Sequence, residues 1–138
     1  MPHEITAGSP KDWLRHAKAD FALASSSLPK DGLYSTLCFH AQQTVEKSVK
    51  AVLVLRGVEF PKIHSLPRLI DLLPTDIIRP ADLLDSARLT AYATVFRYPG
   101  EEDDADVPFD KYQEAVRLAE SVFNWAAALI STSQLKKS

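Results

Sequence analysis

Hydrophobic residues recur every three or four positions along almost the whole chain, which is the spacing of one face of an α-helix. Prolines and glycines divide this pattern into segments, and no segment shows the alternation of a β-strand. The pattern predicts helices over about residues 10–28, 33–57, 66–73, 81–96 and 108–130. Short connections between such helices are typical of an up-and-down bundle. The sequence therefore predicts an all-α bundle of four long helices and one short helix.

The second predicted helix is hydrophobic on more than one side. Phe39, Leu53 and Val54 lie roughly 100–200° away from its main apolar stripe, at about 100° per residue. A helix with two apolar sides is buried on both, and in a small bundle the second side usually faces a partner subunit. We therefore expect a homodimer with Phe39, Gln43 and Leu53 in its interface.

The composition is that of a single globular domain. A chain of 138 residues with 46% hydrophobic and 25% charged residues is neither disordered nor fibrous. We expect one domain over residues 1–138, with its core at about 9–131 and frayed tails. The N-terminus lacks a signal-peptide pattern, and no apolar run approaches the ~20 residues that span a bilayer. Together with the single Cys38, these features predict a cytoplasmic protein without a membrane partner.

Charge and cysteine content exclude several classes of function. The net charge of −2 gives no general attraction for nucleic acid, and Lys and Arg exceed Asp and Glu (nine to six) only in residues 1–69. The four histidines are scattered without the spacing of a metal site, and no glycine-rich phosphate loop is present. We therefore expect no metal, no cofactor and no catalytic residue.

Two groups of polar residues carry the candidate chemistry. The first lies on the second helix, beside Phe39 and Leu53, and is expected to be part-buried and to need partners. It comprises Gln42, Gln43, Glu46, Lys47 and Lys50. The second is the acidic stretch of residues 101–106, which we interpret as a solvated loop, a divalent-cation site being the alternative.

Several short motifs resemble those of the HEPN family, in the family's order, from about residue 10 to residue 130. The most specific is Ala41-Gln42-Gln43-Thr44-Val45-Glu46-Lys47-Ser48-Val49-Lys50-Ala51-Val52-Leu53. The others are Trp13-Leu14, Ala19-Asp20, His64-Ser65-Leu66 and Arg97-Tyr98-Pro99. The resemblance implies an all-α bundle of four to five helices that usually pairs as a homodimer.

The same resemblance implies three roles: a metal-independent endoribonuclease, often a toxin; a partner of a minimal nucleotidyltransferase; or a non-catalytic nucleotide- or RNA-binding protein. Ribonuclease members carry Arg, four to six further residues and then His. After Arg97 those positions hold Glu102, Asp103 and Asp104, and no histidine follows. Their negative charge would repel an RNA phosphate.

We therefore interpret the chain as a non-catalytic binding protein of a toxin–antitoxin-like module, which takes a nucleotide or RNA, or a nucleotidyltransferase partner. The resemblance implies a cleft at Arg97 and Tyr98, with Glu46 as the partner of Arg97. The expected anion-binding residues are Arg97, Tyr98, Lys47, Lys50 and His64. A divergent ribonuclease toxin and a purely structural adaptor are the alternatives.

Overall fold

The computed structural model describes residues 8–89 and 106–137, and the side chains up to residue 133. No strand occurs within these ranges, which confirms the all-α prediction. The helices are α1 (Pro10–Ala24), α2 (Tyr34–Leu55), α3 (Leu66–Asp71), α4 (Ala81–Ser86) and α6 (Phe109–Lys137).

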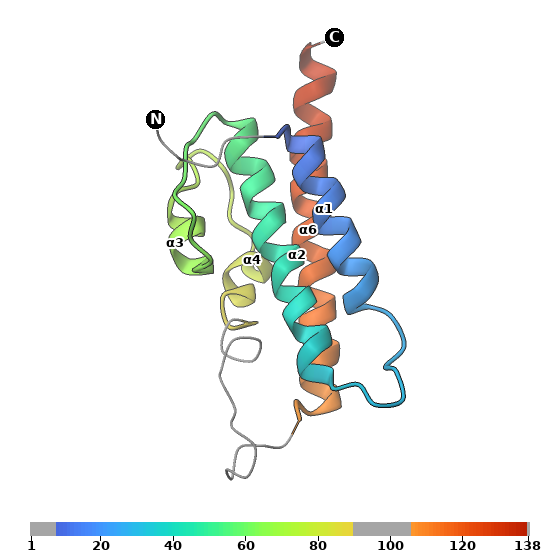
Figure 1. Ribbon diagram of the computed structural model, residues 1–138. Coiled ribbons are helices and arrows are strands. Elements are labelled where there is room, and N and C mark those ends of the chain that lie inside the picture. Colours follow the sequence, from blue (N-terminus) through green and yellow to red (C-terminus); the bar gives the residue numbers. More distant parts are fainter. Residues whose placement is uncertain (1–7, 90–105, 138) are drawn as a thin grey trace.

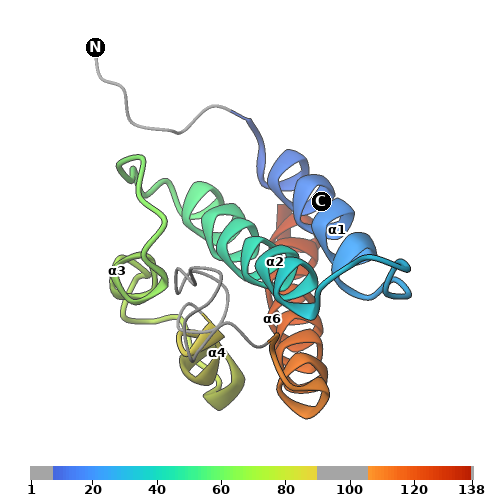
Figure 2. The ribbon, with the colours of Figure 1, turned by 60° about the horizontal axis from the view of Figure 1, so that its bottom comes forward.

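The three long helices lie side by side. Helix α1 runs antiparallel to α2, and α6 runs parallel to α2, as expected for an up-and-down bundle (Figure 1). The short helices α3 and α4 lie on the other side of α2 from α1 (Figure 2). Because α2 has neighbours around much of its circumference, most of its residues between Leu37 and Leu53 are buried. Helix α2 is therefore the centre of the fold.

Local signals explain where the helices begin and end. Ser9 and Asp12 form a capping box at the start of α1. Helix α1 ends at Ala24, before the predicted residue 28, because the hydroxyls of Ser25 and Ser26 donate back to carbonyls of its last turns. Gly57, with a φ of 71°, follows the end of α2.

The start of α2 depends on a distant residue. Its N-cap, Leu33, has no side chain that can accept a hydrogen bond. Instead, the Asp106 carboxylate accepts from the backbone N–H groups of Tyr34 and Ser35, at 2.7 and 2.9 Å. The last residue of the acidic stretch is therefore a helix cap, which is more specific than the solvated loop we expected.

Two further helices differ from the prediction by several positions. The helix expected over residues 81–96 is described as α4 up to Ser86, and residues 90–105 lie outside the described part of the chain. The helix expected to end near residue 130 continues to Lys137, and the prediction of frayed tails stays a prediction. Residues 131–137 contain neither glycine nor proline, and nothing in them forces the helix to stop. The single-domain boundaries remain a prediction.

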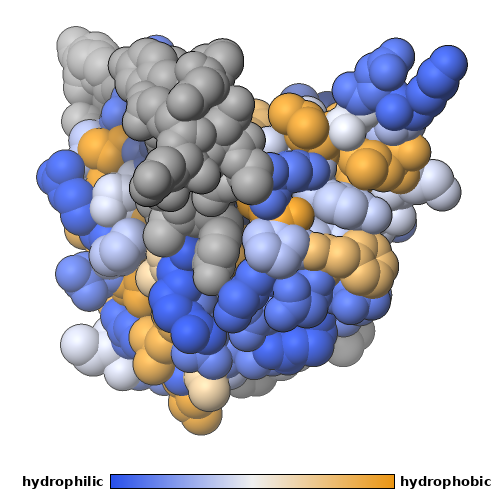
Figure 3. Space-filling view, turned by 90° about the horizontal axis from the view of Figure 1, so that it is seen from below, coloured by the Kyte–Doolittle hydropathy of each residue, from blue (hydrophilic) through white to orange (hydrophobic). Residues whose placement is uncertain are grey.

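The end of the bundle at which α2 begins is largely hydrophilic. In Figure 3, the coloured hydrophobic residues on that face form small clusters between hydrophilic ones. Among the described residues visible there, no large continuous apolar surface is presented. None of the helices described is long and apolar enough to cross a bilayer.

Candidate functional site

Helix α2 carries three polar side chains into the interior along one line. Gln42, Glu46 and Lys50 follow one another at intervals of four residues, so they share one face of the helix. Glu46 is only 2% exposed and Lys50 only 6%. Burying a charged group costs free energy unless the charge is paired. These buried polar side chains therefore need partners, and they mark a structural or functional site.

Glu46 is the centre of a cluster of three side chains, which we call the Glu46 cluster: Glu46, Lys50 and His64. Its Oε2 lies 2.9 Å from Lys50 Nζ and 2.8 Å from His64 Nδ1. The Lys50 ammonium also lies 5.6 Å from the ring centroids of both Trp13 and Phe60. The His64 side chain is 77% exposed. The cluster therefore joins a buried ion pair to an imidazole that solvent and ligands can reach.

Two buried oxygens on this row have no hydrogen-bond partner among the described residues. They are Glu46 Oε1 and Gln42 Oε1, one helical turn apart. Buried acceptors normally have a donor, so these two indicate a missing group that donates hydrogen bonds. A guanidinium, with five N–H donors in a fixed planar arrangement, has the chemistry to satisfy both.

A second carboxylate cluster joins α1 to α2, and we call it the Asp20 cluster: Asp20, His40 and Lys47. Asp20 Oδ1 lies 3.0 Å from His40 Nδ1, and Asp20 Oδ2 lies 2.6 Å from Lys47 Nζ. Both carboxylate oxygens have a partner. Asp20 and His40 were not predicted as site residues, although the Ala19-Asp20 motif was visible in the sequence.

The predicted anion-binding residues divide into separate groups. Lys50 and His64 meet at Glu46, whereas Lys47 belongs to the Asp20 cluster. Arg97 and Tyr98 lie outside the described residues, so the predicted contact between Arg97 and Glu46 stays a prediction.

The predicted dimer interface needs one correction. Leu53 has no exposed surface and belongs to the core of its own subunit, so it was wrongly assigned to a partner-facing side. The second apolar side of α2 is covered here by the same chain, with Phe60 and Leu66 among the neighbouring core residues. Phe39, 43% exposed, and the half-buried Gln43 remain accessible to a partner.

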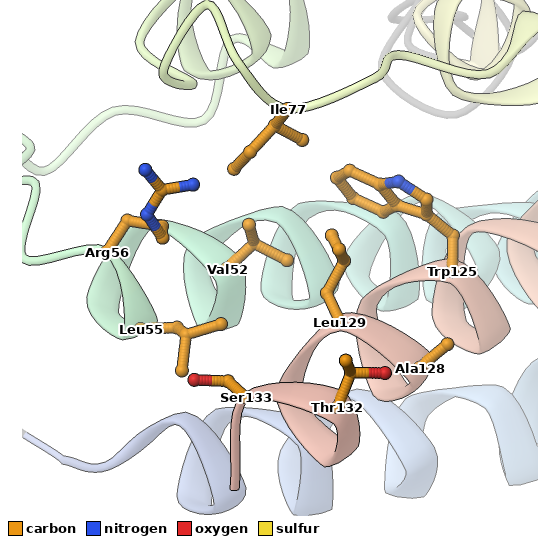
Figure 4. A pocket seen from close by; sticks show the side chains of 9 residues that line it. All are labelled: Val52, Leu55, Arg56, Ile77, Trp125, Ala128, Leu129, Thr132 and Ser133. Atoms are coloured by element: carbon orange, nitrogen blue, oxygen red, sulfur yellow. The ribbon is translucent and has the colours of Figure 1, made fainter. Parts of the chain in front are cut away.

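A separate groove of about 440 Å³ runs between α2 and α6. Its walls are mainly apolar, with Val52, Ile77, Trp125 and Leu129 among the residues that line it (Figure 4). Arg56, the one charged residue among the described side chains that line the groove, forms a bidentate pair with the Asp76 carboxylate, at 3.0 and 3.1 Å. The pair lowers the pKa of Asp76, chiefly through the hydrogen bond from Arg56. The described walls of this groove therefore favour an apolar contact over a catalytic or ionic one.

The described residues give no support for a metal centre. Within residues 8–89 and 106–137, no three His, Cys, Asp or Glu side chains gather in a metal-binding arrangement. The lone thiol is also unsuited to nucleophilic chemistry. Burial, assisted by the nearby Asp106 charge, raises the pKa of Cys38 to about 11.

Comparison with known proteins agrees with the fold. No curated protein matches the chain. The crystal structure of TT1696 from Thermus thermophilus is 29% identical, with a TM-score of 0.67, and the match covers 86% of this chain and 96% of that one. The structure of ST0689, described as an archaeal HEPN homologue, is 30% identical, also with a TM-score of 0.67, over 89% of this chain and 98% of its own. The family model of the HEPN domain matches residues 10–130. The chain belongs to the HEPN family.

Proposed function

We propose that this chain is a non-catalytic HEPN-type binding protein, the nucleotide-binding or nucleotidyltransferase-partner component of a toxin–antitoxin-like module. Arg97 and Tyr98 contact the ligand or partner, and Glu46 holds Arg97 in place.

The observation that carries the proposal is the pair of buried acceptors, Glu46 Oε1 and Gln42 Oε1, which lack donors among the described residues. An arginine that satisfies them uses only some of its five N–H groups. The remaining N–H groups are available for a phosphate or a carboxylate, the anions that a guanidinium binds best.

The geometry also refines the roles of the other candidates. His64 is exposed and anchored at Nδ1, so its second nitrogen can contact a ligand. Lys50 is buried against Glu46 and acts as a positioning residue. Lys47 neutralises Asp20 and is partly accessible, which makes it a weaker candidate for this site.

The sequence argues against the usual ribonuclease chemistry of the family. Cleaving relatives place a histidine after four to six further residues beyond the arginine, and this chain has Glu102, Asp103 and Asp104 at those positions. The last histidine of the chain is His64. Binding is therefore favoured over cleavage.

Calorimetric titration with ATP, and pull-down with a minimal nucleotidyltransferase encoded next to this chain, test the proposal. We expect at least one of the two interactions, weakened about tenfold or more by Arg97→Ala. Arg88→Ala is the matched control, because Arg88 is an exposed arginine whose one ion pair among the described residues is a long contact, 3.8 Å, to Glu114. If both experiments show no interaction, the chain is a structural adaptor and the proposal is wrong.

One observation favours a second candidate, a divergent endoribonuclease. An exposed imidazole oriented by a buried carboxylate, as in His64 and Glu46, is an arrangement suited to proton transfer. Incubation of the purified protein with total cellular RNA separates the two candidates. Cleavage that is lost in both Arg97→Ala and His64→Ala would replace the binding proposal with this one.

The homodimer is part of the proposal and rests now on Phe39 and Gln43. Phe39→Asp places a charge on that exposed surface and should yield a monomer in light scattering. Ile78→Asp is the matched control, because Ile78 is an exposed aliphatic residue that lies between α3 and α4. A Phe39→Asp protein with the mass of the wild type would contradict this interface.

A further inference from the structure

The groove between α2 and α6 exists because α6 continues beyond the last turn of α2. Helix α2 ends at Leu55 and the chain turns away at Gly57, whereas α6 runs on to Lys137. Figure 1 shows the end of α6 projecting past the neighbouring helices. The volume of the groove, about 440 Å³, is within the range of sites that hold small molecules, about 300–1,000 Å³.

Hydrogen bonds hold the walls of this groove in place. Trp125 on α6 donates its indole N–H to the carbonyl of Ile78, at 3.3 Å. Arg79 donates to three carbonyls between residues 70 and 77, at 2.7–3.4 Å, and so fixes the segment that carries Ile77. Because these walls are already ordered, a ligand that enters the groove loses less free energy to the ordering of side chains and backbone.

Apolar side chains from three segments form most of the lining (Figure 4): Val52, Leu55, Ile77, Trp125 and Leu129. Val52 and Ile77 are buried, and the other three are half-buried. Water beside such a surface finds few hydrogen-bonding partners, so an apolar group that displaces it gains free energy. The lining therefore favours the apolar body of a ligand.

The polar groups of the lining favour a ligand without a charge. Arg56 is paired with Asp76 through two hydrogen bonds. A charged ligand would lose hydration without meeting an unpaired opposite charge among the described residues that line the groove. The uncharged polar side chains among them are Thr132 and Ser133, both on α6 (Figure 4). Their hydroxyls can donate to or accept from a neutral polar group.

We propose that this groove binds an uncharged amphipathic small molecule. Its apolar body lies between Ile77 and Trp125, and its hydroxyl or carbonyl head lies at Thr132 and Ser133. The site depends neither on Arg97 nor on the function proposed above. An anionic amphiphile and a second copy of this chain are the two other occupants that the experiment has to distinguish from the proposed one.

Trp125 lines the groove and reports on it directly. The chain has two tryptophans, so in a Trp13→Phe background the emission comes from Trp125 alone. 1-Octanol should shift this emission saturably to shorter wavelength, and octanoate, which has the same chain length and an anionic head, should bind about tenfold or more weakly. Calorimetric titration of the unaltered chain makes the same comparison without Trp13→Phe. Absence of saturable binding, or equal binding of octanoate, would overturn the proposal.

Ala128→Phe fills the groove, because Ala128 is an exposed residue that lines it. We expect octanol binding to weaken about tenfold or more. Ser131→Phe is the matched control, since Ser131 is exposed on the same helix and does not line the groove, and its effect should stay within about twofold. Equal losses in the two variants would contradict the site. A lower mass of Ala128→Phe than of the wild type in light scattering would assign the groove to a second copy instead.

The position of the polar head has its own test. The double variant Thr132→Val with Ser133→Ala removes both hydroxyls and nearly preserves the shape of the lining. Octanol should bind it about fivefold more weakly, as expected for the loss of a hydrogen bond to an uncharged group. An unchanged affinity would show that the head does not lie at these hydroxyls and would overturn this part of the proposal.

Discussion

The Asp20 cluster and the Glu46 cluster have the same composition, a carboxylate, a lysine and a histidine, but they use the carboxylate differently. In the Asp20 cluster, each oxygen has its own partner. In the Glu46 cluster, both partners share Oε2, and Oε1 has none among the described residues. Asp20 is 12% exposed and Glu46 is 2% exposed. Glu46, the more deeply buried carboxylate, is therefore the one with fewer of its oxygens hydrogen-bonded among the described residues.

This difference separates a structural contact from a candidate site. The Asp20 cluster is complete and links α1 to α2, so it needs no further group. In the Glu46 cluster, Glu46 Oε1 lacks a hydrogen-bond donor among the residues that the structure describes. The proposed contact with Arg97 would supply this donor. A protein rarely leaves a buried carboxylate oxygen unbonded without a functional reason.

The largest expected effect is that of Lys50→Met. It leaves the Glu46 charge buried without its ammonium, and we expect the free energy of unfolding to fall by about 3–5 kcal/mol. Chemical denaturation monitored by circular dichroism measures it.

The double variant Lys50→Met with Glu46→Gln is the matched control. It removes both charges, so it should recover most of the lost stability. If Lys50→Met alone costs less than about 1 kcal/mol, Glu46 is better hydrated than its burial indicates, and the contrast between the clusters fails.

A pH titration tests whether the end of α2 that carries the Asp20 cluster is closed to water. Cys38 lies two residues before His40, and burial raises its pKa from 9.0 to about 11. The fold therefore favours the protonated thiol. This contribution is complete below about pH 9 and is lost as the pH rises toward 11. Between pH 8 and pH 10 the wild type should lose about 1 kcal/mol more stability than Cys38→Ala. Equal slopes would show that water reaches the thiol.

The fold was predictable because its signals are local. Apolar spacing and the residues Ser9, Pro10 and Gly57 fixed the helices α1 and α2 to within a few positions. The Asp106 cap was not predictable, because Asp106 is separated from Ser35 by 71 residues and no local sequence pattern indicates that the two segments are in contact.

The site was only partly predictable, for a related reason. The polar residues of α2 followed from spacing, but Asp20, the partner of Lys47, and Phe60, a neighbour of Lys50, lie on other segments. Leu53 shows the same limit. Its angle around the helix indicated a second buried side correctly, but periodicity cannot tell whether the same chain or a partner covers it.

Asp20→Asn should have a smaller effect than Lys50→Met. The amide keeps an acceptor for Lys47 or His40, and the cluster is partly hydrated, so we expect a loss of about 1 kcal/mol in unfolding free energy. Asp31→Asn is the control, because Asp31 is exposed between α1 and α2 and should change nothing. A loss as large as that of Lys50→Met would mean that the two clusters are energetically equivalent.

The smallest expected change in stability, and the sharpest separation of the clusters, comes from removing each imidazole. His64 is 77% exposed, so His64→Ala should alter the unfolding free energy by less than about 0.5 kcal/mol. If the Glu46 cluster is a binding site, the same variant weakens ATP binding about tenfold in calorimetry. His40→Ala should do the reverse, since His40 satisfies Asp20 Oδ1 between two helices: a measurable loss of stability with unchanged ATP affinity. If both variants lower the stability and neither weakens ATP binding, the Glu46 cluster is a second structural contact. The hydrogen bond with Glu46 would then be the role of the His64 imidazole.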